Sequence, residues 1–318
     1  MQTAVFLLNL GGPRNLAEVE PYLYELFLDV LPPGLGPLKP LLARVIAKTR
    51  APSSSEKYAL IGGRSPLVER TEEQARALAA ALGPGFTTHL AMRCGHPSTE
   101  EGVREALAAG AVRGVALPLY PQWANATTRS SLAELRRLWP RDRHLVEVCT
   151  WHDHAGWLDA SAAAVRDAIA TVPAELRDRL LVVFSAHGLP LSQVKKGDPY
   201  PQYVEISARG TAERCGLAPG AWAVTYQSRV GPMKWLGPDT IEYLEGNARG
   251  RAVVAVPIAF VSEHLETLYD LDILAKEAAQ KAGAACFARA AAVGARPDFI
   301  AALADIVRAA IAGQQKAA

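Results

Sequence analysis

The chain has 318 residues, of which 50% are hydrophobic and 21% are charged, and its net charge is only +2. This length predicts about two domains, each with a sizeable core. The near-neutral charge argues against a protein that binds nucleic acid through a dominant basic surface. No segment approaches the ~20 uninterrupted apolar residues of a membrane span, and the N-terminus lacks the basic region of a signal peptide. Four widely spaced cysteines without a CxxC pair exclude a zinc ribbon and a dense disulfide framework, and favour the cytoplasm.

Short apolar runs rich in β-branched residues alternate with stretches of helical spacing along the chain. Continuously apolar runs such as LLVVF predict strands that are buried on both faces of a parallel sheet. We therefore expect two doubly wound α/β halves that join near residue 150. The predicted strands span 3–10, 87–94, 114–120 and 145–150, then 180–185, 223–227 and 252–260.

The halves open with similar segments, TAVFLLNLGGP and LLVVFSAHGLP. In open parallel sheets, ligands bind beyond the carboxyl ends of the strands, so the loops after the predicted strands are the places to search for chemistry. The NLGGP motif matches neither a dinucleotide fingerprint nor a phosphate loop. Gly11 and Gly12 instead indicate a close approach of the backbone to a ligand.

Residues 30–52 depart from the alternating pattern because they combine clustered Pro and Gly with apolar and basic side chains. One interpretation is a helical hairpin packed on the domain. The other is an apolar lip, rimmed by Lys39, Arg44, Lys48 and Arg50, that touches an anionic membrane or a hydrophobic substrate.

Candidate chemistry follows two of the buried runs. His187 lies at the end of one predicted strand, and His264 and Glu266 follow another. Helical spacing would place Glu266 and Asp270 on one face as like charges, which indicates a pathway for cations or protons, although an acidic helix start is an alternative. These residue types suit a transient divalent metal or proton transfer near neutral pH, and they form no closed zinc set. A structural role for His187 stays open on this evidence.

Two loops at strand ends carry large apolar side chains. Met233 and Trp235 lie in one loop, and Tyr120 and Trp123 lie in the other. Such residues predict walls for a flat apolar ligand, although packing between domains would also account for them.

A series of motifs runs along almost the whole chain: LLNLGGP, LFLD, KTRAP, IGGRSP, MRCGHP, YPQWANATTRSS, FSAHGLP, GDPYP, YQSRVGPMKWLGP, PIAFVSEHLETLYDLD and RPDFIAALADIV. In this order the motifs resemble those of the ferrochelatases, which insert ferrous iron into a porphyrin. The fold that this resemblance implies is two Rossmann-like domains with a porphyrin cleft between them. We accordingly expect domains at 1–150 and 151–296, with a C-terminal helix at 297–318 that packs back on the first.

The resemblance also implies roles for individual positions. His187 matches the active-site histidine of the family, and His264 with Glu266 matches its His-x-Glu pair. Three positions depart from the common pattern, since Cys94 stands where Tyr is usual, Arg129 replaces Gly and Lys234 replaces Pro. The Cys94 difference puts a contact that depends on Tyr in doubt. The implied porphyrin contacts are Leu10, Arg93, Tyr120, Met233 and Trp235.

The implied reaction is insertion of Fe²⁺ into protoporphyrin IX to form protohaem, the terminal step of haem biosynthesis. His187 is then the expected proton acceptor and, with Glu266, a transient ligand of Fe²⁺, while Asp270 is a further candidate ligand. Glu266, with His264 and Asp270, would steer protons or metal, and the side from which iron arrives stays open. The site would bend the macrocycle, because only contacts that are stronger in the bent state accelerate insertion.

Other functions remain open at this point: a coproporphyrin III ferrochelatase, a cobalt or nickel chelatase acting on sirohydrochlorin, and a non-catalytic tetrapyrrole carrier. The VGPMKWLGP motif resembles the ferrochelatases that use protoporphyrin. We expect no permanently bound cofactor and no iron–sulfur cluster, since no cysteine follows Cys286. Porphyrin and Fe²⁺ are the expected partners, without nucleic acid, in the cytoplasm and with peripheral membrane association through residues 30–52.

Overall fold

The computed structural model describes residues 2–229 and 233–313, and the chain divides into two units. The first contains the chain up to residue 119, residues 125–149 and the chain from residue 304 onward, whereas the second contains residues 120–124 and 150–303. Each unit is built on a four-stranded parallel sheet, which confirms the predicted α/β class.

The boundary differs in two places from a division at residue 150. Residues 120–124 belong to the second unit, where the side-chain amide of Gln122 donates hydrogen bonds to Ser207 Oγ at 2.9 Å and to the Ile258 carbonyl at 3.2 Å. Helix α12 (Pro297–Ile311) is shared, because its residues up to 303 belong to the second unit and the rest to the first.

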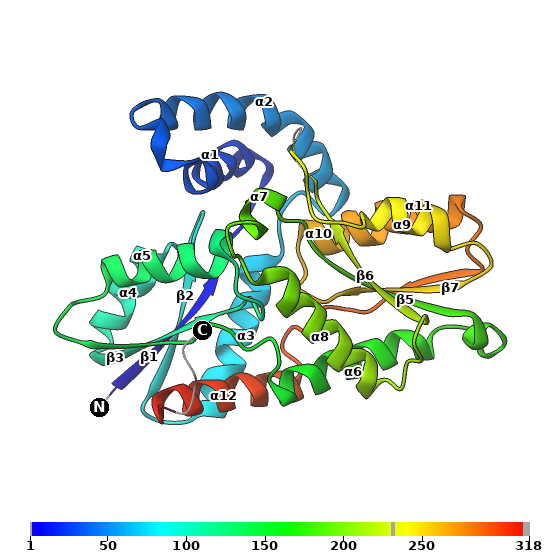
Figure 1. Cartoon of the computed structure of the whole chain (residues 1–318). Helices are drawn as coiled ribbons and strands as arrows, with labels where there is room; N and C mark the ends of the chain where they lie inside the picture. Colours follow the sequence, from blue (N-terminus) through cyan, green and yellow to red (C-terminus); the bar gives the residue numbers. More distant parts are fainter. Residues whose placement is uncertain (1, 230–232, 314–318) are drawn as a thin grey trace. The chain divides into compact units, whose positions relative to one another are not determined.

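The first sheet has the strand order β2-β1-β3-β4. Its central strand β1 runs between β2 and β3, and every residue of β1 after Gln2 is buried. Helices α1 and α2 pack against each other, and Figure 1 shows them as a pair above the first sheet. The elements are β1 (Gln2–Asn9), α1 (Val19–Val30), α2 (Leu38–Leu60), α3 (Leu67–Leu82), β2 (Phe86–Met92), α4 (Thr99–Ala108), β3 (Ala111–Pro118), α5 (Ser130–Leu138) and β4 (His144–Glu147).

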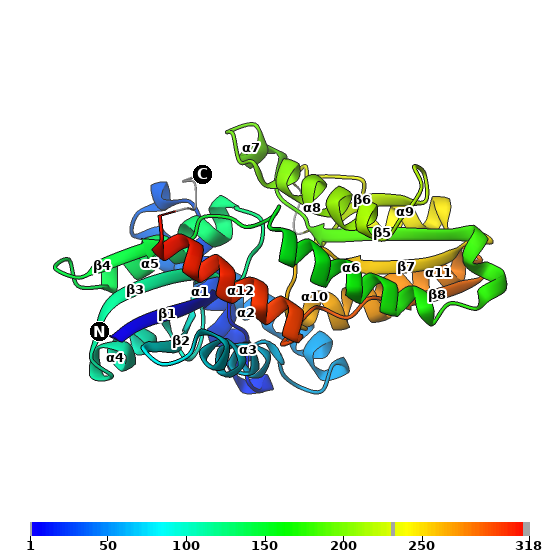
Figure 2. The same cartoon turned by 90° about the horizontal axis from the view of Figure 1, so that it is seen from below.

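The second sheet repeats this order as β6-β5-β7-β8. Figures 1 and 2 show α9 and α11 on one face of this sheet and α6 and α8 on the other. Strand β8 is absent from the predicted strands because its four half-buried residues carry neither a long apolar run nor clear alternation. The elements are α6 (Ala155–Ala170), β5 (Leu180–His187), α7 (Leu191–Val194), α8 (Tyr200–Arg214), β6 (Trp222–Gln227), α9 (Thr240–Asn247), β7 (Ala252–Pro257), α10 (Leu265–Leu268), the π-helix η5 (Asp270–Ala275), α11 (Lys276–Lys281) and β8 (Cys286–Arg289).

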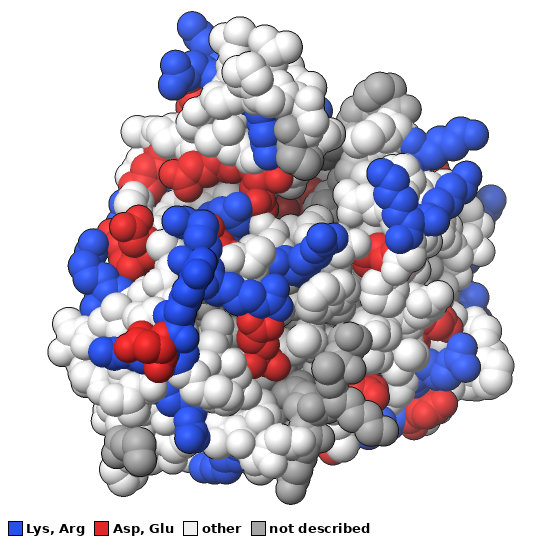
Figure 3. Space-filling view, turned by 60° about the vertical axis from the view of Figure 1, so that its left-hand side comes forward, with Lys and Arg blue, Asp and Glu red and all other residues white. Residues whose placement is uncertain are grey.

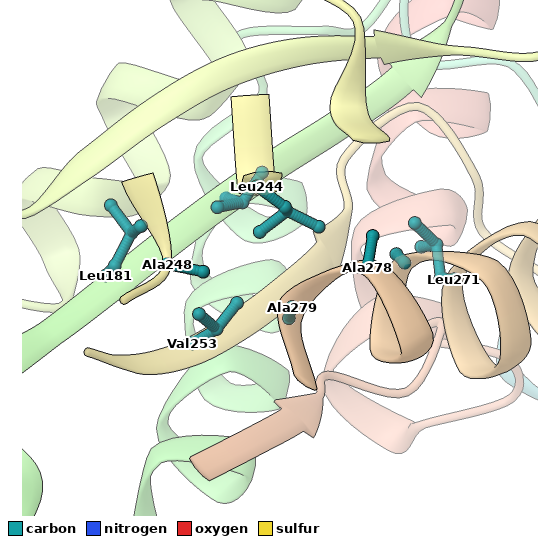
Figure 4. Close-up of a cluster of buried hydrophobic side chains, with 9 residues drawn as sticks. Leu181, Leu244, Ala248, Val253, Leu271, Ala278 and Ala279 are labelled. Atoms are coloured by element: carbon teal, nitrogen blue, oxygen red, sulfur yellow. The ribbon is translucent and has the colours of Figure 1, made fainter. Parts of the chain in front are cut away.

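A cluster of buried side chains joins the second sheet to the helices on one of its faces (Figure 4). Leu181 and Val183 of β5 point into this cluster together with Leu244 of α9 and Leu271 of η5. Because side chains alternate along a strand, Val182 and Phe184 face the other way, and both are fully buried as well. Burial on both faces explains why this strand is continuously apolar.

In each sheet the two central strands connect to outer strands that lie on opposite sides of them. In the second unit, β5 connects to β6 on one side of the sheet, whereas β7 connects to β8 on the other. The connections therefore diverge beyond the carboxyl ends of β5 and β7, and a crevice at such a switch point is the usual ligand site of an open α/β sheet. His187 is the last residue of β5, and His264 follows β7.

Residues 30–52 are not a separate segment. Helix α1 ends at Val30, and α2 continues through Pro52 as far as Leu60. Along α2, Ala43 and Ala47 are buried, whereas the large apolar side chains Leu38, Leu41 and Val45 are more than half exposed at 63%, 62% and 52%. Within the described part of the chain, no helix is long and apolar enough to cross a membrane.

The NLGGP loop packs closely on other segments of the first unit. Gly11 has φ +91°, and a Cβ atom there would lie only 1.9 Å from the backbone oxygen of Cys94. A Cβ atom on Gly12 would lie 2.6 Å from the Cβ of Ser65. These glycines therefore allow close packing of the chain on itself, and the approach of this backbone to a ligand stays a prediction.

Replacement of Gly11 by Ala should destabilise the protein more than replacement of Gly62. Both glycines have positive φ values, +91° and +100°, but nothing lies within 4 Å of a Cβ atom at Gly62. We expect Gly62→Ala to cost roughly 1–2 kcal/mol from backbone strain alone, and Gly11→Ala to cost about 1–3 kcal/mol more from the clash. Urea denaturation of both variants measures the difference. Equal losses would show that the contact with Cys94 is not a constraint.

Candidate active site

The end of β5 sets the tautomer of His187. Its Nδ1 lies 2.7 Å from the carbonyl oxygen of Gly188. A carbonyl oxygen only accepts hydrogen bonds, so Nδ1 carries the proton and Nε2 holds the lone pair of the neutral ring. The half-buried imidazole therefore has the form that a proton acceptor requires.

The loops after β5 and β6 pair with each other and bring Trp235 beside His187. The backbone N–H of Leu191 donates to the Lys234 carbonyl at 2.9 Å, and that of Leu236 donates to the Leu189 carbonyl at 2.9 Å. A Cβ atom built on Gly188 would lie 3.2 Å from the Trp235 ring. The glycine after His187 thus leaves room for the indole.

His264 and Glu266 form a direct pair after β7. His264 Nδ1 lies 3.0 Å from the Ser262 carbonyl oxygen, and Nε2 lies 3.2 Å from Glu266 Oε2. Since the carbonyl oxygen requires a proton on Nδ1, a neutral ring would present a lone pair on Nε2 to the carboxylate. The contact is favourable only when a proton or another cation lies between the two atoms. The pair is therefore arranged to hold one exchangeable positive charge.

An aromatic side chain fixes the position of the His264 ring. The rings of Phe260 and His264 meet edge to face, with their centroids 4.5 Å apart. The side chains of His264 and Glu266 are 14% and 26% exposed, so the pair is shielded but can be reached from solvent.

Gln227 connects the His187 loop to the segment that carries Glu266. As the last residue of β6, it is the register partner of His187, and its carbonyl accepts the Gly188 N–H at 2.8 Å. Its side-chain amide donates to the Glu266 carbonyl at 2.7 Å and lies 3.5 Å from Asp270 Oδ2. Ser185 Oγ donates to Gln227 Oε1 at 2.5 Å, which orients the amide.

Glu266 and Asp270 do not belong to one uninterrupted α-helix. Helix α10 ends at Leu268, and Asp270 begins a π-helix in which the Leu274 N–H donates to the Tyr269 carbonyl at 3.0 Å. Asp270 Oδ2 accepts a hydrogen bond from Ser228 Oγ at 2.5 Å, whereas the Glu266 carboxylate faces His264. The two carboxylates therefore have different partners, and their stacking on one face as a pair of like charges stays a prediction.

Ser228 has a strained backbone at this point. Its φ is +65°, and among the described residues it alone combines positive φ with a side chain. This conformation costs roughly 1–2 kcal/mol, and the hydrogen bond to Asp270 offsets part of the cost. Backbone strain and π-helical turns both concentrate at functional sites, and here they adjoin each other.

Arg289 at the end of β8 pairs with two acidic residues of the same region. Nε and Nη2 donate to the two carboxylate oxygens of Asp272 at 2.7 and 2.9 Å, and Nη1 donates to Glu263 Oε1 at 2.9 Å. Burial opposes the charge on Glu263, yet its pKa lies below the ordinary value because of the facing Arg289. Burial also opposes the charge on Arg289, whose pKa is nevertheless raised by Asp272 and Glu263.

Two predicted porphyrin contacts, Leu10 and Arg93, belong to the first unit, where they directly follow β1 and β2. Arg93 Nε donates to Ser130 Oγ at 2.8 Å, and Nη2 pairs with Asp29 of α1. Ser130 Oγ donates in turn to Asp29 Oδ2 at 2.7 Å. The guanidinium is therefore held by protein partners, and a role in porphyrin contact stays a prediction.

The Cys94 side chain is buried. It therefore does not offer the exposed aromatic surface that a tyrosine could present to a ligand. Burial raises the pKa of its thiol to about 12, so the thiol is neutral at physiological pH. Its backbone carbonyl, which packs on Gly11, is the feature of this residue that shapes the loop.

The other predicted wall residues lie in the second unit. Tyr120 is half-buried, Trp235 is half-buried, and Met233 is 55% exposed. Residues 230–232 of the VGPMKWLGP motif lie outside the described residues.

In residues 2–229 and 233–313, no three His, Cys, Asp or Glu side chains are grouped so that they could hold a metal ion. Sequence reasoning missed Gln227, Ser228, Phe260, Glu263 and Arg289 as parts of the site. All except Arg289 lie inside the quoted motifs, where their polar or aromatic character beside His187 or His264 was the available signal. Arg289 had no such signal, because its strand was not predicted.

Comparisons with known proteins agree with this fold and with the motifs. The ferrochelatase family model matches residues 2–311. Ferrochelatase of Synechococcus sp. (strain RCC307) is 41% identical over 99% of this chain and 84% of its own length. Ferrochelatase of Caulobacter vibrioides (strain NA1000 / CB15N) is 42% identical over 96% of this chain and 89% of its own length.

Among solved structures, SirB from Bacillus subtilis with Fe³⁺ has a TM-score of 0.59 at 14% identity, covering 98% of this chain and 97% of that chain. The sirohydrochlorin chelatase SirB from Bacillus subtilis subspecies spizizenii, in complex with cobalt, has a TM-score of 0.54 at 12% identity, covering 98% of this chain and 95% of that chain. At these identities the two structures support the fold alone.

The sequence matches cover nearly the whole chain, and the residues they include surround the switch point of the second sheet. The chain belongs to the ferrochelatase family of chelatase enzymes.

Proposed function

We propose that the protein inserts Fe²⁺ into protoporphyrin IX to form protohaem, the terminal step of haem biosynthesis. The observation that carries the proposal is the arrangement at the carboxyl ends of β5 and β7. There, a histidine with an available lone pair adjoins, through Gln227, a His–Glu pair whose geometry suits one exchangeable cation. Insertion has these two requirements, since protons must leave the ring and a divalent cation must enter it.

In this proposal His187 accepts a pyrrole proton at Nε2. The Gly188 carbonyl stabilises the resulting imidazolium, because Nδ1–H already donates to it. Removal of the second inner proton and delivery of the metal involve Glu266. The cation that the His264–Glu266 contact requires is then a proton in one state and Fe²⁺ in another.

Weak coordination suits a metal that must be transferred. A transient site made from His187 and Glu266, with Asp270 as a further candidate, offers mixed nitrogen and oxygen ligands that bind Fe²⁺ without caging it. Asp270 already accepts the Ser228 hydrogen bond, so we assign it a supporting role. Fe²⁺ is substrate here, and the absence of a permanent cofactor and of an iron–sulfur cluster stays a prediction.

The choice of protoporphyrin over coproporphyrin III depends on the wall residues. Protoporphyrin carries fewer carboxylates and more apolar substituents than coproporphyrin. Trp235 beside His187, with the exposed Met233, favours the apolar substituents. We retain Leu10, Arg93 and Tyr120 as the other proposed porphyrin contacts, and a coproporphyrin III ferrochelatase as the alternative function.

Surface association with a membrane is a second part of the proposal. Leu38, Leu41, Leu42 and Val45 follow the spacing of one helical face of α2, and all four are exposed. Figure 3 shows mostly uncharged atoms at the top of the molecule, which Figure 1 identifies as α2, with Lys and Arg at the margin. An apolar face edged by cations suits an anionic lipid surface. We place the reaction in the cytoplasm, on or near such a surface, and the free thiol state of all four cysteines suits this compartment.

An anaerobic assay with Fe²⁺ tests the substrate. Protoporphyrin IX and coproporphyrin III are offered separately, and the absorption of the metallated product is followed. We expect faster insertion into protoporphyrin, because the apolar walls match its substituents. Faster insertion into coproporphyrin III would show that the protein is a coproporphyrin III ferrochelatase with the same mechanism. Tight porphyrin binding without insertion of any metal would favour a non-catalytic tetrapyrrole carrier.

The two proposed catalytic groups should affect turnover rather than binding. His187→Ala removes the proton acceptor and should lower kcat by about 10²–10⁴-fold, while porphyrin affinity, measured by fluorescence quenching, stays nearly unchanged. Glu266→Gln should also slow insertion more than it lowers the melting temperature.

Matched controls are His144→Ala and Glu245→Gln, both at exposed positions. His144 begins β4 of the first sheet, and Glu245 lies in α9 beside the second sheet. Near-normal turnover of His187→Ala would remove His187 from catalysis. A collapsed melting temperature of Glu266→Gln would mark Glu266 as structural.

Aspartates on the exposed face of α2 should weaken vesicle binding. We expect the wild type to sediment with phosphatidylglycerol vesicles and Leu41→Asp/Val45→Asp to do so at least about tenfold less, since apolar insertion is lost. Leu60→Asp is the control, because Leu60 lies in the same helix, 64% exposed, outside residues 30–52. Equal sedimentation of wild type and double variant would refute membrane association through this face.

A further inference from the structure

The segment that carries the candidate chemistry after β7 is short and irregular. Between residues 263 and 275 the chain forms one turn of α-helix and then a π-helix. A single helical turn has little stability of its own. The positions of His264, Glu266 and Asp270 therefore depend on contacts that hold the segment from outside.

Arg289 makes such contacts at two points. Through Nη1 it holds Glu263, the residue before His264, and through Nε and Nη2 it holds Asp272, two residues after Asp270. The residues between these anchors include all three candidate groups. Because a guanidinium is planar and presents its donors in a fixed fork, both anchors are set by one rigid group.

The Arg289 side chain is itself fixed. It is only 12% exposed, and Nη1 also donates to the Ala290 carbonyl at 3.2 Å. Glu263 Oε1 accepts a second hydrogen bond from the Ala292 N–H at 2.9 Å. The clamp thus ties the irregular segment to the end of β8, a strand of the sheet that positions His187.

We propose that Arg289 is a positioning residue that clamps the segment between Glu263 and Asp272 and so fixes His264 and Glu266 for metal insertion. This inference rests on the proposed function for its catalytic consequence. Its structural part, the clamp, does not depend on the reaction.

Arg289→Lys is the first test, because lysine keeps the positive charge but offers a single ammonium group instead of a fork. We expect kcat for Fe²⁺ insertion to fall at least about tenfold, with porphyrin affinity within about twofold of the wild type. Hydrogen exchange should become faster in peptides that cover residues 263–275, with little change elsewhere in the second unit.

Asp272→Asn is a milder second variant, chosen in case Arg289→Lys folds poorly. Asp272 is 38% exposed, and the amide preserves its shape while it weakens one arm of the clamp. We expect the same pattern with a smaller loss of kcat. Arg251→Lys is the matched control, since Arg251 precedes β7 at the opposite end of the sheet and binds the carbonyls of Arg179 and Leu180.

The outcomes separate the inference from the proposed function. If the wild type inserts no metal, the proposed function fails, while hydrogen exchange still tests the clamp. If the wild type is active and Arg289→Lys keeps kcat within about twofold, the positioning role is refuted. A loss of kcat in Arg251→Lys equal to that in Arg289→Lys, at similar melting temperatures, would show general destabilisation and also refute it. Unchanged exchange in residues 263–275 refutes the clamp itself.

Discussion

The strand order of the second sheet is the constraint on which the candidate site depends. Since β5 connects to one side and β7 to the other, the chain must diverge beyond their carboxyl ends. His187 and His264 are 77 residues apart in the chain. This divergence brings His187 and the His264–Glu266 pair to the same end of one sheet. The continuous burial of β5 and β7 makes that end rigid, because a close-packed strand does not shift without disturbing the core on both of its faces.

The positions of the ring protons on His187 and His264 decide which nitrogen of each imidazole is available for chemistry. Both histidines use Nδ1 to donate to a backbone carbonyl, so both present Nε2 for chemistry. The difference lies in what Nε2 meets, since that of His264 faces a carboxylate and therefore needs a cation between them. In the proposed function, one imidazole accepts a proton and the other forms half of a pair that holds a cation. This division of roles suits the exchange of protons for a metal.

The backbone departs from regular helix and strand geometry at two places beside the candidate site. Ser228 adopts a left-handed backbone, and the helix after β7 widens into a π turn at Asp270. Each departure is stabilised by a specific partner: the Ser228–Asp270 hydrogen bond, the Gln227 amide and the Arg289 fork. The site is therefore held by polar contacts to the sheet rather than by helix stability.

The sequence alone determined the α/β class and seven of the strands, and it supplied the candidate site residues, whose chemical roles stay predictions. Buried apolar runs are a local signal, and polar residues directly after them can be recognised without knowledge of the fold. Only the tertiary structure decided that Gly11 packs on the Cys94 carbonyl, that Glu266 and Asp270 face different partners, and that Arg289 on the unpredicted strand β8 reaches Glu263 and Asp272. These features depend on distances between segments far apart in the chain, and on a π turn that residue spacing does not encode, so no local pattern could have revealed them.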